Sequence, residues 1–148
     1  MAAPPPRPVV AVGAVIWDGA DAILLVRRGR PPRLNEWSIP GGKVEWGEGV
    51  EEALRREAEE ETGLRLKQLN FVAVVDALFR ADDGSITDHY VLIDYWARAC
   101  GGTLRVGDDA AEARWVRFED LDHYPMWSET RGVIAAAEKL LRTLPTNP

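Results

Sequence analysis

An almost entirely apolar run near the start of the chain, from Val9 to Ile16, places the strongest constraint on the fold. The run is rich in β-branched side chains, which is typical of a strand buried on both faces. Asp18 and Gly19 then give a hairpin turn signal, and the apolar residues 22–26 return as a second strand, antiparallel to the first. We therefore expect a sheet that is covered on both faces.

Two helical segments are available to cover such a sheet. Strong helix formers run from about Gly49 to Thr62, and Gly63 lies where a left-handed C-cap is expected. From about residue 128 to residue 144 apolar side chains recur at helical spacing, until Pro145 ends the pattern. The two segments are far apart in the sequence, so each can cover a different face.

The rest of the chain contains β-rich runs separated by turn residues. We expect strands at 69–79, 90–99 and 113–118, a loop at 81–84, and a longer loop at 29–42 with one short extended piece around Trp37. Strands mixed with two helices predict an α/β fold, an α/β/α sandwich with a central mixed β-sheet.

Length, charge and cysteine content narrow the class of protein. The 148 residues suffice for a single domain, expected at 9–148 after a disordered tail at 1–8. No apolar run approaches the roughly 18 residues of a membrane helix, so we expect no membrane partner. A net charge of −6 repels polyanions, which argues against nucleic acid and for a small-molecule partner. Cys100 is the only cysteine, which favours a reducing compartment, the cytoplasm.

The first helical segment carries charge where apolar residues are expected. When the segment is wound at about 100° per residue, the apolar stripe that includes Val50 and Leu54 is centred close to Glu57. Glu61 lies within the same face and Glu60 at its edge, each about one turn from Glu57. Three like charges are therefore crowded against the face that should pack on the core.

A glutamate-rich helix is ordinarily a solvated surface, and the opposite face of this helix fits that description. Partly buried carboxylates that repel one another need protons or a cation, and hard divalent metal ions favour carboxylate oxygens. We therefore predict a Mg²⁺ or Mn²⁺ site at Glu57, Glu60 and Glu61. Arg56 can pair with Glu60 at i+4 and with Glu52 at i−4, which would hold one carboxylate in place.

The segment 42–64 resembles the Nudix box, the signature of the Nudix hydrolases. That signature is a Gly, five residues, Glu, seven residues and then Arg-Glu-apolar-x-Glu-Glu-x-Gly-apolar. Ala58 and Leu64 occupy the apolar places, and the other positions are matched by Gly42, Glu48, Arg56, Glu57, Glu60, Glu61 and Gly63. The lead-in at 37–42 and the order of elements over 9–118 are similar to the family as well, and the short loops and the run at 108–110 resemble compact ADP-ribose pyrophosphatases.

The resemblance implies a Nudix fold and metal-dependent cleavage of a diphosphate. Glu57, Glu60 and Glu61 would ligate the metal, the Gly42 carbonyl could add another oxygen, and Arg56 would belong to the same catalytic set. Metal ions in such a site neutralise phosphate charge and lower the pKa of the attacking water. Glu48 in the family is more often an orienting residue than a ligand.

A general base is also required, and it should be a carboxylate within hydrogen-bond reach of the water. The resemblance favours Asp109, because many relatives carry a Glu six residues before the tryptophan that corresponds to Trp115. Asp108 and Glu112 are neighbours that could serve instead, and the acidic loop is equally well explained as a surface loop.

Four residues are candidates for contact with the substrate. Arg27 and Arg28 end the second strand, where guanidinium groups could bind a diphosphate or lie on a solvated rim. Trp37 and Trp46 flank the box and could stack on the substrate, although large aromatic residues more often belong to the core.

The sequence is compatible with more than one function. ADP-ribose or a similar nucleotide sugar is the leading substrate, and normal or oxidised nucleoside triphosphates such as 8-oxo-dGTP are the alternative. A catalytically silent nucleotide-binding regulatory module would show a damaged box, whereas the box is intact. An isomerase of isopentenyl diphosphate would need a further Cys and Glu, and Cys100 has no recognisable context for that role. The aromatic-rich segment 115–127 could supply a homodimer interface.

Overall fold

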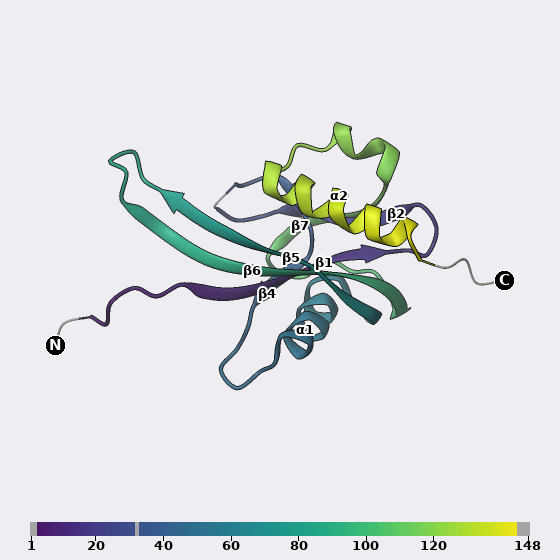
Figure 1. The fold of residues 1–148 in the computed structure, drawn as a ribbon, viewed down its shortest axis with the longest axis horizontal. Helices are drawn as coiled ribbons and strands as arrows, with labels where there is room; N and C mark the ends of the chain where they lie inside the picture. The colour runs from purple at the N-terminus through teal and green to yellow at the C-terminus, as the bar shows by residue number, and fades with distance from the viewer. Residues whose placement is uncertain (1–2, 32, 145–148) are drawn as a thin grey trace.

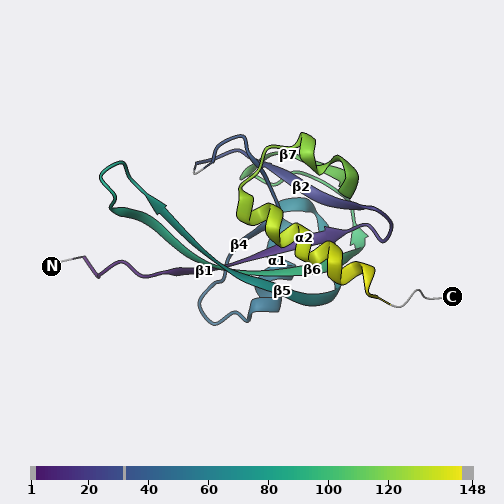
Figure 2. The same ribbon diagram turned by 45° about the horizontal axis from the view of Figure 1, so that its top comes forward.

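The computed structural model describes residues 3–31 and 33–144, which form a mixed β-sheet between two helices (Figure 1). Helix α1 covers one face of the sheet and α2 covers the other (Figures 1 and 2). The predicted α/β/α sandwich is therefore confirmed. In chain order the elements are β1 Val9–Trp17, β2 Ala22–Arg28, β3 Trp37–Ser38, β4 Gly41–Lys43, α1 Val50–Thr62, β5 Leu64–Arg80, β6 Ile86–Gly102, β7 Ala110–Arg117, the 3-10 helix η1 Phe118–His123, and α2 Ser128–Arg142.

The two central strands, β1 and β2, pair with each other only beside their hairpin turn. Strand β1 pairs in parallel with β6 along its whole length, from Val9 opposite Tyr90 to Trp17 opposite Arg98. On its other side β1 pairs with β2 at Trp17, beside the hairpin turn, and with β4 at residues 11–13. Strand β2 pairs instead with β3 and β7. The two halves of the sheet therefore separate beyond the hairpin, and the cavity described below lies along this opening.

Two hydrophobic cores confirm that β1 and β2 are buried on both faces. Val15 and Ile23 belong to the core under α2, with Ile134 from the helix itself. Their neighbours Ile16 and Leu24 belong to the core under α1, where Leu54 contributes from the helix. Successive residues of a strand point to opposite faces, so one run of apolar residues serves both cores.

Strands β5 and β6 are longer than the sequence pattern predicts. Each spans 17 residues, and together they form a hairpin whose tip extends away from both helices (Figure 1). Their pairing shifts register in several places, and Gln68 has a positive φ of 56° beside one of these shifts. Bulges of this kind interrupt the alternation of apolar and polar residues, so the strand ends were not recognisable locally. The 3-10 helix η1 was not predicted either.

The start of the described chain has no regular secondary structure, and the aromatic segment 115–127 packs partly on the core. Residues 3–8 form no helix or strand, while residues 1–2 of the expected tail and Pro145 lie outside the described residues. Within the described ranges, no helix combines the length and the apolar character needed to cross a membrane. In segment 115–127, Phe118, Tyr124 and Trp127 pack against the core of their own chain. A homodimer interface at this segment stays a prediction.

Candidate active site

A cavity of about 720 Å³ lies along the opening of the sheet. Glu57 and Glu61 of α1 line it beside the glycines of β4, and Asp109 lines it from the loop before β7. Phe79 and Trp127 also line it, and the two rings contact each other with their centroids 6.1 Å apart. The cavity therefore has an acidic part and an aromatic part.

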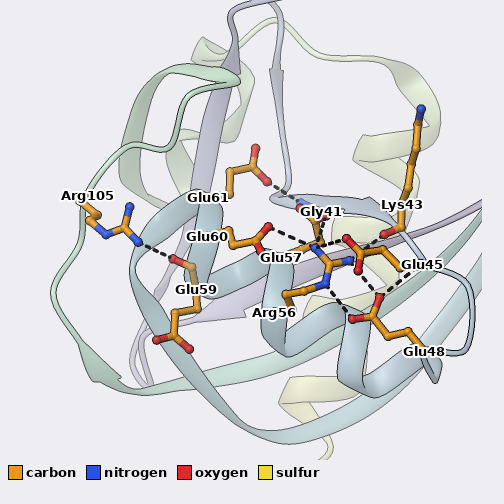
Figure 3. A network of polar contacts seen from close by, with 10 residues as sticks. All are labelled: Gly41, Lys43, Glu45, Glu48, Arg56, Glu57, Glu59, Glu60, Glu61 and Arg105. Carbon is orange, nitrogen blue, oxygen red and sulfur yellow. Dashed lines mark hydrogen bonds and ion pairs between the residues drawn. The ribbon is translucent and has the colours of Figure 1, made fainter.

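Arg56 is the centre of the polar network on α1 (Figure 3). Its Nε donates to Glu48 Oε2 at 2.7 Å, and its Nη1 donates to Glu57 at 2.9 Å and to Glu60 at 3.1 Å. A further bond from Nη2 to the Lys43 carbonyl ties the network to β4. The expected pairing with Glu60 is confirmed, whereas Glu52 is not among the ion pairs of Arg56 in the described part of the chain. Arg56 thus fixes two of the three predicted metal ligands.

The network holds Glu48 in its ionised form. Hydrogen bonds from Arg56, with a smaller contribution from the backbone of Glu45, lower the pKa of Glu48 to about 2. The Glu48 carboxylate is thereby held in a charge-assisted pair with the Arg56 guanidinium, which agrees with an orienting role for Glu48.

Glu57 and Glu61 lie in the partly buried region that the helical phase predicts. Burial raises the pKa of Glu57, while Arg56 opposes that effect. Burial also raises the pKa of Glu61, to about 7, although this carboxylate accepts a hydrogen bond of 2.9 Å from the Gly41 amide. The negative charges of Glu57 and Asp109 contribute to the same upward shift. These carboxylates are thus held close together in a region where ionisation is unfavourable.

Gly42 lets β4 approach this acidic cluster closely. A Cβ atom on Gly42 would lie 2.3 Å from the carboxylate carbon of Glu57. Any larger residue would therefore displace the Glu57 carboxylate from its present position beside the β4 backbone. This closeness suits the expectation that the Gly42 carbonyl adds an oxygen to the same site.

The donor set fits a hard divalent cation, although its members point in different directions. Glu57 and Glu60 are turned toward Arg56, and Glu61 is turned toward the Gly41 amide (Figure 3). Accordingly, within residues 3–31 and 33–144 no three carboxylate, histidine or cysteine side chains already converge as a metal site. The carboxylate chemistry and the raised pKa values still favour a positive ion at Glu57 and Glu61, with the more exposed Glu60 at the rim.

The loop before β7 brings Asp109 to the site. The amide of Gly107 donates to the Glu61 carbonyl at 2.8 Å, and the amide of Arg105 donates to the Thr62 carbonyl at 2.9 Å, so the loop caps the C-terminal end of α1. Asp109 lines the cavity and pairs with Arg30 at 3.1 Å. Glu112 pairs instead with Arg27 and Arg114.

Of the three candidates for the general base, the structure places Asp109 in the cavity lining, and Asp108 and Glu112 outside it.

The candidate substrate-binding residues differ in their positions. Arg27 and Arg28 line the cavity. Trp37 also lines it but is mostly buried in the core, where its ring makes a T-shaped contact with the ring of Tyr124. Trp46 is fully exposed on the loop between β4 and α1 and is not part of the lining, and its role as a stacking residue stays a prediction.

Phe79, Trp127 and Asp94 are among the cavity residues that the sequence did not indicate as site residues. The two aromatic residues come from the end of β5 and from the residue before α2, which no local pattern connects. Asp94 lies on β6 opposite Gly13 of β1. A glycine inside an apolar strand often marks the close approach of another group, and Gly13 was the signal available for Asp94.

Comparisons with known proteins agree with this geometry. The NUDIX domain family model matches residues 7–137. The ADP-ribose pyrophosphatase of Methanocaldococcus jannaschii is 39% identical over 119 residues; the alignment covers 80% of this chain and 66% of that protein, slightly less than two thirds of it. The nucleoside triphosphatase NudI of Escherichia coli is 31% identical over 122 residues, and the alignment covers 77% of this chain and 84% of that protein.

A solved structure shows the same fold. The MutT NUDIX hydrolase from Burkholderia pseudomallei superposes with a TM-score of 0.77 at 37% sequence identity, covering 88% of this chain and 98% of that one. Because the family model spans residues 7–137 and the similar proteins carry the names of pyrophosphatases and hydrolases, the chain belongs to the Nudix hydrolase family.

Proposed function

We propose that the chain uses a divalent metal ion, Mg²⁺ or Mn²⁺, to hydrolyse the diphosphate linkage of ADP-ribose or a similar nucleotide sugar. The observation that carries this proposal is the cavity, which joins the acidic cluster around Glu57 and Glu61 to the aromatic pair Phe79 and Trp127. Its volume of about 720 Å³ lies within the usual range for small-ligand sites. A diphosphate at the acidic part leaves room for a nucleoside along the rest of the cavity.

Residues in the cavity lining and beside it would have different roles in this reaction. Glu57, Glu60, Glu61 and the Gly42 carbonyl would hold the metal ion, and Arg56 keeps Glu57 and Glu60 in place. When bound, the ion supplies neutralisation of phosphate charge and increases the acidity of water. Arg27 and Arg28 would bind the phosphate oxygens from the β2 side. Asp109 would accept the proton of the attacking water, since it is the candidate base that lines the cavity.

The second candidate substrate is a nucleoside triphosphate, normal or oxidised. It is supported by the likeness to the nucleoside triphosphatase of Escherichia coli. The products separate the two candidates, because ADP-ribose gives AMP and ribose 5-phosphate, whereas a triphosphate gives a nucleoside monophosphate and pyrophosphate. We place the activity in the cytoplasm, since a lone cysteine suits a reducing compartment.

Product analysis with a matched pair of variants tests the proposal. Wild type, Glu61→Gln and Glu59→Gln are incubated with Mg²⁺ and a panel of ADP-ribose, NADH, dinucleoside polyphosphates, nucleoside triphosphates and 8-oxo-dGTP. Glu59 is exposed on the same helix and lies outside the cavity, so its variant controls for the loss of one charge. We expect cleavage of ADP-ribose, reduced on the order of 10³-fold by Glu61→Gln alone. Cleavage of triphosphates alone would favour the second candidate, and no cleavage by any protein would favour the silent binding module.

A further inference from the structure

Asp94, in the middle of β6, is a buried carboxylate that has no partner within the protein. It is 5% exposed, and burial alone accounts for the rise of its pKa to about 6. Among the described residues, none donates a hydrogen bond to Asp94 or forms an ion pair with it. In the described part of the chain, every side-chain oxygen that is inaccessible to solvent has a hydrogen-bond partner. The oxygens of Asp94 are therefore not sealed in the core but reach the cavity that this residue lines.

The backbone around Asp94 is shaped to leave its carboxylate open. Asp94 on β6 lies opposite Gly13 on β1, and Gly13 lies opposite Gly41 on β4. A Cβ atom on Gly13 would be 2.4 Å from Asp94 Oδ1 and 3.0 Å from Ile39 Cδ1. The carboxylate thus extends over the bare backbone of Gly13. On the side of Asp94 that faces β1 and β4, both residues of this row are glycines, so neither of them places a side chain over the carboxylate.

This arrangement is unfavourable unless a ligand completes it. The residues two positions away on the same face of β6, Leu92 and Trp96, belong with the apolar core under α2. An unpaired carboxylate between them has lost most of its contact with water and gained no protein donor, which destabilises the fold. Buried polar groups almost always have a hydrogen-bond partner, so an exception inside a cavity indicates that the partner is the bound molecule.

We propose that Asp94 determines substrate specificity by accepting a hydrogen bond from an N–H or O–H group of the nucleoside part of the substrate. The inference rests on the proposed function, since it requires a nucleotide whose phosphates lie at Glu57 and Glu61. Gly41 donates to Glu61 and lies two strand spacings, about 10 Å, from Asp94 along the row. The phosphate end and the Asp94 end of the cavity are thus separated by about the distance that a nucleoside covers.

An ionised carboxylate can only accept hydrogen bonds, which defines the chemistry it selects. Amino and ring N–H groups of a nucleobase satisfy it, and so do the hydroxyl groups of ribose. A nucleoside that presents only hydrogen-bond acceptors at this position leaves the carboxylate unpaired, so the nucleotide that contains it binds more weakly. Asp94 therefore discriminates by the position of a donor, whichever of these two parts of the nucleoside supplies it.

The test measures binding without catalysis. Wild type, Asp94→Asn and Asp76→Asn are titrated by calorimetry with AMP, GMP and UMP in Mg²⁺, because these monophosphates have no diphosphate linkage to cleave, and KM and kcat are then measured with ADP-ribose. Asp76 is exposed on β5 and outside the cavity lining, so its variant is the matched control. Two further arms locate the donor. The 2′-deoxy and 3′-deoxy forms of AMP remove one hydroxyl each, and purine riboside monophosphate and IMP remove the amino groups of AMP and GMP.

We expect Asp94→Asn to weaken binding of the preferred nucleotide about 10- to 100-fold and to raise KM more than it lowers kcat, while Asp76→Asn matches wild type. The analogue that lacks the donor should bind weakly to wild type and equally weakly to Asp94→Asn, which identifies base or ribose as the source. Unchanged binding by Asp94→Asn, or additive losses with every analogue, would overturn the inference while leaving the proposed function intact. If wild type binds and cleaves no nucleotide, the proposed function fails and the inference falls with it.

Discussion

The two helices cover opposite faces of the same sheet, yet their buried sides differ in chemistry. The buried residues of α2 are all apolar: Val133, Ile134, Ala137 and Leu141. Helix α1 buries Ala53, Leu54, Ala58 and Thr62 in the same manner but inserts Glu57 and Glu61 beside them. The buried side of α2 is therefore apolar throughout, although the start of this helix also lines the cavity, whereas the buried side of α1 carries a cluster of carboxylates. The difference locates the functional face of the fold and predicts that this face reduces stability when no cation is present.

Core truncation should affect both helices equally and produce the largest losses of stability. Leu54 and Ile134 are each 1% exposed, in the cores under α1 and α2 respectively. Replacing either by Ala removes buried carbon atoms and leaves a cavity, so each variant should lower the free energy of unfolding by about 2–5 kcal/mol. Urea denaturation measures both. A loss below 1 kcal/mol or so for Leu54→Ala would show that α1 is not packed as a core helix.

Gly42→Ala should damage the α1 side through the site rather than through the core. The new methyl group would displace the Glu57 carboxylate, since the two would overlap at 2.3 Å. We expect kcat/KM to fall on the order of 100-fold, because a small displacement of a catalytic group has effects of that size. Steady-state kinetics with Mg²⁺ provides the measurement. Activity close to wild type would show that Glu57 can move without loss of function.

The stability of the metal-free protein should depend on pH through Glu61. Burial raises its pKa from 4.5 to about 7, so the native state binds this proton more tightly than the unfolded chain does. The resulting stability is fully present below pH 4.5 and is lost as the pH rises through about 7, a change of about 3 kcal/mol. Asp94 should add a similar decline between pH 3.8 and about 6. Denaturation of Glu61→Gln across this range should lack the upper part of the decline, and an identical pH profile would contradict the assignment.

A glycine on the α2 side offers the smallest and opposite effect. Gly132 lies within α2, and a Cβ atom there would have no neighbour within 4 Å. Gly132→Ala should therefore raise the free energy of unfolding by about 0.5–1 kcal/mol through helix propensity and leave kcat/KM unchanged. Thermal denaturation and a kinetic assay check the two parts. A loss of activity would mean that α2 also takes part in the reaction.

The fold and the acidic cluster could be predicted where local chemistry determines them. The apolar phase of α1 predicts Glu57 and Glu61 against the core, and Gly63 ends the helix in the left-handed conformation that its position predicts. Other features depend on contacts distant in sequence. The burial of Asp94 depends on its pairing with Gly13, and no local pattern in β6 distinguishes it from a solvent-facing strand residue. Trp46 shows the converse, because proximity to the signature in sequence did not bring it to the cavity.

The central claim is that the carboxylates of α1 oppose folding until a divalent cation binds them. The most direct test is the melting temperature of wild type and Glu61→Gln at pH 8, in EDTA and then with saturating Mg²⁺. We predict that Glu61→Gln melts on the order of 5 °C higher than wild type in EDTA, and that Mg²⁺ raises the melting temperature of wild type much more than that of the variant. A variant that melts below wild type in EDTA, or a wild type that does not respond to Mg²⁺, would contradict the claim.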